Sequence, residues 1–140
     1  MSQSKKPATN KVDNLLSREC RLRTPKEFQH VYRSKQWGGS QHHTFNALAN
    51  ELVDKTTSRL GVTVSKKVAK QAVVRNRIKR QIKEFYRLRS ESISNIDLVI
   101  TAKPSCAKAS DFDRQQSLEQ LWDKILKWQR WSLANRANHK

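Results

Sequence analysis

The side chains best placed to do chemistry in this sequence are a cluster of cations. Residues 66–89 contain ten Lys and Arg side chains and a single acid, Glu84. The cations are Lys66, Lys67, Lys70, Arg75, Arg77, Lys79, Arg80, Lys83, Arg87 and Arg89. Because so much charge of one sign repels itself, an anionic partner is the simplest explanation, and nucleic acid is the leading candidate.

Two smaller patterns suit RNA. Ser65, Lys66 and Lys67 lie where a strand is predicted to end and a helix to begin, so backbone N–H groups and ammonium groups can converge there on a phosphate. Phe28 and Tyr32 are four residues apart on a predicted helix, where they serve the core, the stacking of unpaired bases, or both. The ordinary alternatives are a polar loop with two lysines and a pair of core aromatics.

The residues that a protein nuclease needs are scattered. Hydrolysis requires carboxylates that together hold metal ions, or a histidine pair for acid–base work. Neither Asp97 nor Glu84 has a carboxylate neighbour in the sequence. His42 and His43 are adjacent in a predicted strand, which directs them to opposite faces and makes them poor joint metal ligands. We therefore predict no catalytic side chain, no metal site and no protein-bound cofactor.

Composition indicates a small basic domain. The chain has 140 residues, and 29 Lys plus Arg against 12 Asp plus Glu give a formal charge of +17. Such a domain binds nucleic acid or an anionic membrane surface, and the narrow apolar stripe of the main basic helix, which lacks Trp, disfavours the membrane. No apolar segment resembles a membrane span or an export signal, so we expect a cytoplasmic protein.

Cys20 and Cys106 belong to no CxxC pattern, so we expect both to be reduced thiols. We also expect the protein itself to be monomeric.

The N-terminal half is predicted to contain one helix and one strand after a mobile basic tail at residues 1–17. Thr24-Pro25-Lys26-Glu27 supplies an N-cap, a proline at N1 and a capping-box glutamate, so a helix starts there. Gly38-Gly39 is predicted to end this helical unit. A half-buried strand is expected within 42–50, and a turn at 54–58.

The C-terminal half is predicted to contain a strand at 59–65, a helix at 69–88 and a strand at 96–102, which together suit a parallel crossover. The last strand is almost continuously apolar and should be buried on both faces. Pro104 closes this strand, and 107–110 is a linker. A final helix spans 113–131, which completes one domain at 18–131, and a frayed tail follows at 132–140. The four tryptophans, Trp37, Trp122, Trp128 and Trp131, are assigned mainly to packing of the last helix and of the turn after the first, with exposure left open for Trp128 and Trp131.

The basic helix has two distinct faces at 100° per residue. Its apolar stripe comprises Val74, Ile78, Ile82 and Phe85. The opposite side carries Asn76, Arg80, Lys83 and Arg87, flanked by Arg77 and Lys79. A solvated helix face usually mixes both signs of charge, so this face predicts contact with RNA or DNA.

Residues 59–87, RLGVTVSKKVAKQAVVRNRIKRQIKEFYR, closely resemble the signature of the bacterial ribonuclease P protein subunit. The most specific piece is the RNR sequence at 75–77 followed by Lys79-Arg80, with GVTVSKK preceding it at 61–67. The resemblance extends over 22–129 and includes the aromatic helix, the IDLVITAKP strand and the LEQLWDKIL helix. It implies an α+β fold, a small α-β sandwich in the order αβββαβα. This fold has about four strands, with an extra strand near 37–41 or a divided 44–50, and a left-handed crossover against the usual right-handed rule.

In that family the RNA subunit uses Mg²⁺ to hydrolyse the bond that joins the 5′ leader to precursor tRNA, while the protein binds both RNAs and broadens the range of substrates. The resemblance implies contacts to the catalytic RNA by Arg75, Asn76, Arg77, Lys79, Arg80, Lys83 and Arg87. It implies a leader path between the first helix and the sheet, lined by Phe28, Tyr32, Ser65, Lys66 and Lys67. A leader-lining aromatic of the family falls near 45–48. Trp37-Gly38-Gly39 and His42-His43 match nothing in the family pattern.

Two other classes stay open on the residues alone. A ribosomal or other structural RNA-binding protein would fit the charge equally well. A self-sufficient nuclease would need the clustered carboxylates or histidines that the sequence does not show. The cleavage of precursor tRNA by the protein, with and without the catalytic RNA, separates all three.

Overall fold

The computed structural model describes residues 20–50 and 58–138, so the predicted tail at 1–17 and most of the predicted turn at 54–58 lie outside the described residues. The helices are α2 (Pro25–Arg33), α3 (Ala72–Arg89) and α4 (Asp111–Asn138), with short 3-10 helices η2 (Ser90–Ser92) and η3 (Pro104–Lys108). The strands are β1 (Trp37–Gly39), β2 (His43–Ala49), β3 (Arg59–Thr63) and β4 (Ile96–Ala102).

The four strands form one mixed sheet in the order β1-β2-β4-β3. Strands β3 and β4 are parallel and are connected through α3, whereas β1–β2 and β2–β4 are antiparallel. The α+β class and the order αβββαβα are confirmed, and the extra strand is β1, within the predicted region 37–41. Strand β4 is buried at every position except Thr101, as expected of a central strand covered on both faces. The left-handed crossover stays a prediction.

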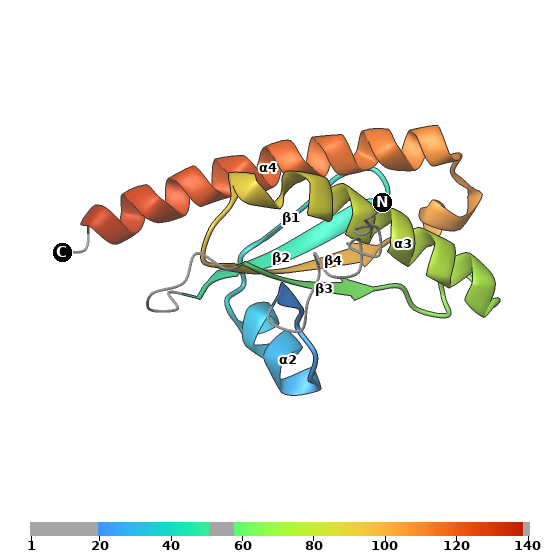
Figure 1. Ribbon diagram of the computed structural model, residues 1–140, viewed down its shortest axis with the longest axis horizontal. Helices are drawn as coiled ribbons and strands as arrows, with labels where there is room; N and C mark the ends of the chain where they lie inside the picture. The colour runs from blue at the N-terminus through green and yellow to red at the C-terminus, as the bar shows by residue number, and fades with distance from the viewer. Residues whose placement is uncertain (1–19, 51–57, 139–140) are drawn as a thin grey trace, which may run out of the picture.

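The two faces of the sheet are covered unequally (Figure 1). Helices α3 and α4 lie on one face and enclose the main core, which includes Phe45, Ala47, Leu60, Ile78, Ile82, Leu98, Ile100, Leu118 and Trp122. On the other face, the nine-residue α2 covers a small cluster of Leu22, Val31 and Val99, with Phe28 and Leu48 packed against it. The alternate residues of the strands therefore belong to two separate apolar layers.

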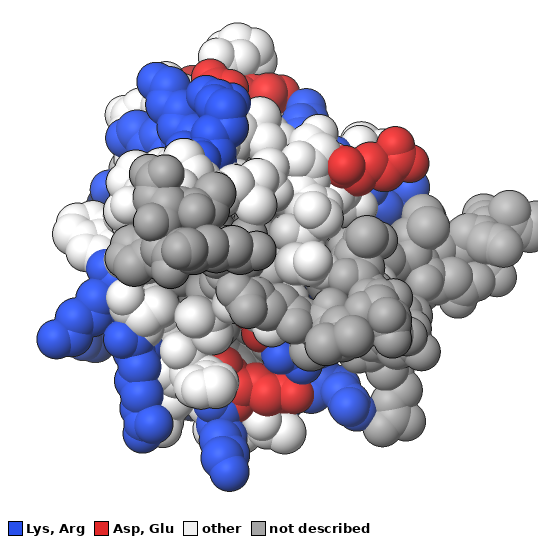
Figure 2. All heavy atoms as spheres, turned by 90° about the vertical axis from the view of Figure 1, so that its left-hand side faces the viewer, with Lys and Arg blue, Asp and Glu red and all other residues white. Residues whose placement is uncertain are grey.

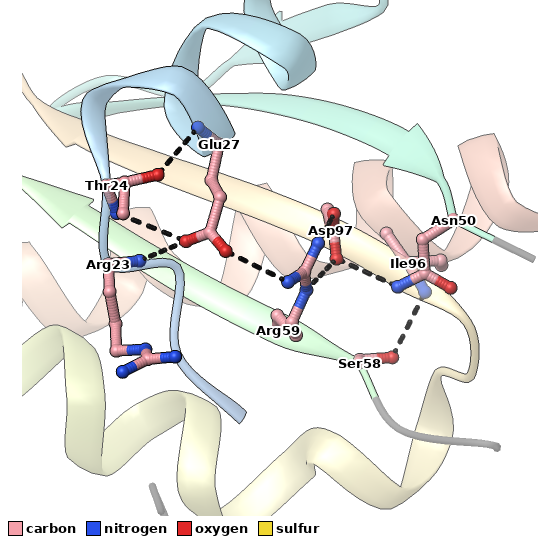
Figure 3. Close-up of polar contacts among 8 residues, drawn as sticks. All are labelled: Arg23, Thr24, Glu27, Asn50, Ser58, Arg59, Ile96 and Asp97. Carbon is pink, nitrogen blue, oxygen red and sulfur yellow. Dashed lines mark hydrogen bonds and ion pairs between the residues drawn. The ribbon is translucent and has the colours of Figure 1, made fainter. Parts of the chain in front are cut away.

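Figure 3 shows how α2 is fixed to the sheet. The Thr24 hydroxyl accepts the Glu27 N–H at 3.2 Å, and the Glu27 carboxylate accepts the N–H groups of Arg23 and Thr24, which confirms the predicted capping box. The same carboxylate lies 3.3 Å from Arg59, which donates two hydrogen bonds to Asp97 at 2.9 and 2.6 Å. The Arg23 N–H is the main cause that lowers the pKa of Glu27, and the bonded Asp97 raises the pKa of Arg59.

Several predicted boundaries are wrong. Gly38-Gly39 does not end the helical unit but lies in β1, and a Cβ on Gly38 would come within 2.7 Å of the Phe45 ring. Strand β3 ends at Thr63, α3 begins at Ala72, and part of the predicted linker at 107–110 belongs to η3. Helix α4 continues to Asn138, past the predicted end at 131, because 132–138 contains no Gly or Pro and Ser132 is buried.

His42 and His43 form part of a buried polar cluster, and the expectation that they face opposite ways is wrong. His42 precedes β2 and bonds through Nδ1 to Ser105 at 2.7 Å, while His43 Nδ1 lies 2.8 Å from the Ser117 hydroxyl. His43 Nε2 also lies 3.5 Å from Cys106 Sγ. Both rings therefore contact η3, and the His43 ring also contacts α4. Burial is the main cause that lowers the pKa of His43 to about 4 and raises that of Cys106 to about 11.

Candidate nucleic-acid interface

Helix α3 separates its apolar and cationic side chains as its sequence predicts. Ile78, Ile82 and Phe85 are buried against the sheet, and Val74 is half-buried. Tyr86 is also buried, which the predicted stripe did not include. On the outer side, Asn76, Arg77, Arg80 and Lys83 are exposed and Lys79 is half-buried. The structure thus presents these side chains along one helix surface, which we call the outer surface of α3.

The ends of α3 use their cations within the protein. Arg75 donates hydrogen bonds to the carbonyl oxygens of Ala69 and Lys70 at 2.9 and 2.7 Å, and so holds the loop that leads into the helix. Arg87 pairs with Glu84, and this bond lowers the pKa of the carboxyl. At the last residue, Arg89 contacts Glu119 and the Phe85 ring, at 2.8 Å and 3.8 Å respectively.

The cations in the middle of α3 differ from those at its ends. Within residues 20–50 and 58–138, no Asp or Glu forms an ion pair with Arg77, Lys79, Arg80 or Lys83. Arg75 and Arg87, by contrast, are part of the helix ends just described. From the sequence alone, all these cations formed one predicted RNA-binding set. Only the structure separates those that bond within the protein from those that do not.

The Ser65-Lys66-Lys67 segment is an exposed turn after β3. The Ser65 hydroxyl accepts the Lys67 N–H at 3.2 Å, and the Ser65 carbonyl accepts the N–H of the buried Val68 at 3.0 Å. Because α3 starts only at Ala72, these residues do not lie at a helix N-terminus, contrary to the prediction. Their two ammonium groups remain exposed, so charge rather than backbone N–H groups is what this turn offers to a phosphate.

The two aromatic residues of α2 differ in exposure. The Phe28 ring packs on β3 at Gly61, where a Cβ would lie 2.6 Å from two ring atoms. Phe28 is half-buried against the cluster of Leu22, Val31 and Val99. Tyr32, one helical turn later, is 40% exposed. Phe28 is therefore mainly a packing residue, and Tyr32 offers more free ring surface.

The part of the sheet that α2 leaves uncovered is polar. Thr44, Asn46, Thr63 and Thr101 alternate along the strands with residues of the main core, so they face the α2 side. All four are half-buried, and we call them the open sheet surface. Of the predicted region 45–48, Phe45 is buried on the opposite face and Leu48 packs under α2. Strand β2 thus presents no aromatic residue on this surface.

A separate hollow of about 600 Å³ lies beside α2 and is lined in part by His30, Arg33, Arg59 and Asp97. None of the side chains predicted to contact RNA lines it. Within the described part of the chain, no three His, Cys, Asp or Glu residues are arranged to hold a metal ion.

Figure 2 shows the end of the molecule at which α4 ends, where Lys and Arg side chains project around the outline and Asp and Glu form a few small groups.

Comparison with known proteins identifies the family. The family model described as Ribonuclease P matches residues 16–126, most of the chain. The chain belongs to the ribonuclease P protein family. A ribonuclease P protein component from Idiomarina loihiensis is 45% identical over 111 residues, which cover 79% of this chain and 86% of the relative. One from Vibrio cholerae is 39% identical over 109 residues, with 78% and 90% covered.

Solved structures of ribonuclease P proteins have the same fold. The Staphylococcus aureus RNase P protein aligns with a TM-score of 0.69 at 27% identity, over 76% of this chain and 94% of that one. The Thermotoga maritima protein, at 23% identity and a TM-score of 0.58 over 72% and 93%, supports the fold alone. The ribonuclease P family match ends at residue 126, so the last turns of α4 lie beyond it. In the described residues no helix is apolar enough over a sufficient length to cross a membrane.

Proposed function

We propose that this chain acts as the protein subunit of ribonuclease P and that it binds two RNA segments on two separate surfaces. The outer surface of α3 binds the catalytic RNA. Tyr32, Phe28 and the Ser65–Lys67 turn bind the single-stranded 5′ leader of precursor tRNA. The complex removes this leader in the cytoplasm, and the protein raises substrate affinity and broadens the range of substrates.

The observation that carries this proposal is the charge on the middle of α3. Four cations lie close together there without an acidic partner among the described residues, although Arg87 and Arg89 in the same helix have one. Their mutual repulsion is relieved when phosphates bind, and the released counterions add to affinity. The family match gives the partner as an RNA of the ribonuclease P complex.

We further propose that the RNA subunit carries the chemistry and uses Mg²⁺. The described acids of α2, β4 and α3 are paired with arginines: Glu27 and Asp97 with Arg59, and Glu84 with Arg87. A Mg²⁺ site needs oxygen ligands that are grouped around the ion. The described side chains do not fit such a site, so the protein's part is to bind and position RNA.

The test is cleavage of precursor tRNA by the purified protein, by the catalytic RNA, and by both together at low Mg²⁺. We expect cleavage by the combination only. Cleavage by the protein alone would overturn the division of labour, and no stimulation of the RNA would exclude the subunit role in favour of a structural RNA-binding protein. Arg77→Ala and Arg80→Ala should weaken assembly with the catalytic RNA, while Phe112→Ala, at an exposed position on α4, serves as the matched control.

The leader surface is tested by a ratio of affinities. Tyr32→Ala should reduce the affinity of the reconstituted complex for precursor tRNA and leave that for mature tRNA, which has no leader, almost unchanged. Stacking on an aromatic ring contributes roughly 1–3 kcal/mol per base. The salt dependence should steepen by about 0.7 in log–log slope for each leader phosphate that Lys66 and Lys67 neutralise. An unchanged affinity ratio in Tyr32→Ala would assign Tyr32 to packing alone.

A further inference from the structure

Trp37 is a large aromatic residue that the fold leaves uncovered. Its exposed fraction is 69%, although it lies in a hydrogen-bonded strand of the sheet. The assignment of Trp37 to packing is therefore wrong. An exposed tryptophan in a strand has either no role or a partner that covers it, and its position decides between these two.

The neighbouring glycines fix the face on which Trp37 lies. A Cβ on Gly38 would touch the Phe45 ring, which belongs to the main core. A Cβ on Gly39 would lie 3.4 Å from the Thr44 methyl group and 3.9 Å from Lys103 Nζ. Because side chains alternate along a strand, Trp37 shares the face of Gly39 and Thr44. Trp37 is thus on the open sheet surface, at its β1 edge.

The strand register places Trp37 and Phe28 at the two ends of one row. Trp37 pairs with Asn46, Asn46 with Val99, and Val99 with Gly61, which lies under the Phe28 ring. Three strand spacings separate the ends, or roughly 14 Å. This separation exceeds the roughly 3.4 Å between stacked bases of one strand. The two rings would therefore contact different bases of an extended strand, not adjacent stacked ones.

A second row of cross-strand neighbours on the same face lies beside the row from Trp37 to Gly61, and it carries polar groups. Thr44, Thr101 and Thr63 are cross-strand neighbours on the same face, and Lys103 Nζ lies at the β1 end of their row, where it donates to the Ser40 carbonyl at 2.6 Å. Hydroxyl and ammonium groups suit phosphates and ribose 2′-hydroxyls. A sheet that combines such groups with outward-facing aromatic residues is one of the ways in which proteins bind unpaired RNA.

We propose that Trp37 stacks on a base of single-stranded RNA, and that the open sheet surface carries the RNA from α2 across the strands to β1. This inference rests on the proposed function, in which α2 binds the leader, and extends the leader path to the far edge of the sheet. On this surface the exposed aromatic residue is Trp37 of β1, whereas β2 presents Thr44 and Asn46 there.

The experiment compares Trp37→Ala, Trp37→Phe and Phe112→Ala in the complex reconstituted with catalytic RNA. Phe112 has the same exposed fraction, 69%, but lies in α4, on the opposite face of the sheet. For precursor tRNA with a long leader, Trp37→Ala should weaken binding roughly 5- to 150-fold, the range for one stacked base. Trp37→Phe should keep most of the affinity, and Phe112→Ala all of it. The loss should vanish with mature tRNA and with leaders too short to span roughly 14 Å.

The outcomes separate this inference from the proposed function. If Tyr32→Ala changes the ratio of precursor to mature affinity and Trp37→Ala does not, the leader does not reach β1 and the inference is wrong. If neither variant changes this ratio, the leader-binding function itself is wrong. A loss in Trp37→Ala that is equal for mature tRNA would also overturn the inference. As a direct readout, single-stranded RNA should quench the fluorescence of Trp37 in the full chain, so Trp37→Phe should remove quenching that Trp131→Phe retains.

Discussion

The two faces of the sheet are built from alternate residues of the same strands, yet they differ in the side chains they carry and in the helices that cover them. On the face covered by α3 and α4, strand positions such as Phe45, Leu98 and Ile100 are buried and apolar. On the α2 face, the positions beneath this short helix are apolar, whereas Thr44, Thr63 and Thr101 lie in the uncovered part together with the exposed Trp37. The choice of Thr keeps the β-branched shape that strands favour and adds a hydroxyl for a partner.

This difference separates the main source of stability from the surface proposed for the leader, because the two lie on opposite sides of one sheet. The covered face holds most of the buried apolar area, which is the main source of stability. On the α2 face, the nine-residue helix is fixed to the sheet by its capping box and by the Glu27–Arg59–Asp97 ion pairs. Substitutions on the two faces should therefore change different measurable quantities.

The largest effect is expected on the covered face. Ile82→Ala removes a fully buried side chain from between α3 and the sheet and should reduce the free energy of unfolding by about 2–5 kcal/mol. Thr101→Ala, on the open sheet surface, should reduce it by about 1 kcal/mol or less, the span of strand propensities. Chemical denaturation of both variants checks this. Equal losses would mean that the two faces contribute alike to stability.

The second effect is a loss of stability in acid that originates at His43. Its pKa is about 4 in the folded protein, below the ordinary value of 6.5, because burial disfavours the charged ring. Between pH 6.5 and 4 the unfolded chain therefore binds a proton at His43 that the folded protein does not bind. The contribution of the neutral His43 to the free energy of unfolding is fully present above pH 6.5 and decreases as the pH falls toward 4. The loss should approach about 3 kcal/mol. Unfolding measured against pH for wild type and His43→Gln tests this, since the variant should lose that part of the pH dependence.

A smaller effect is expected where α2 is capped. Thr24→Ala removes the hydroxyl that accepts the Glu27 N–H and should cost about 0.5–2 kcal/mol. Because α2 alone positions Phe28 and Tyr32, leader affinity should decrease as well. Thr24→Ser keeps the acceptor and is the matched control. If Thr24→Ala binds the leader like wild type, the helix start is not needed to order these rings.

The smallest change in stability is expected on the outer surface of α3. Arg77 is exposed and forms no ion pair with any described residue. Arg77→Ala should leave the melting temperature unchanged or slightly raised, since it relieves repulsion, while assembly with the catalytic RNA weakens. Thermal unfolding and an RNA-binding titration measure the two quantities. A marked fall in melting temperature would show that Arg77 supports the fold instead.

Local patterns in the sequence predicted much of the fold. The Thr24–Glu27 capping box, the stripe of α3 and the buried strand β4 depend on residues close together in the chain, and the structure confirms all three. The family resemblance supplied the extra strand that pattern reasoning lacked. Strand β1 has only three residues, two of them Gly, which is too short for an alternation to be recognised.

The parts of the site that the sequence did not predict depend on distant contacts. The face of Trp37 is fixed by the register between β1 and β2, and the bonds of Arg75 to the preceding loop depend on where α3 begins. The polar cluster around His43 joins β2 to η3 and α4 across more than sixty residues of sequence. Periodicity within one element contains no information about any of these.

The close packing of Phe28 on Gly61 has a consequence for how the family can diverge. A single added carbon at position 61 would occupy the space of the ring and push it off the sheet. A larger residue at 61 thus becomes acceptable only together with a smaller one at 28. We expect these two positions to covary among relatives, so that an evolutionary record of paired substitutions would trace a contact between a helix and a strand that lie more than thirty residues apart.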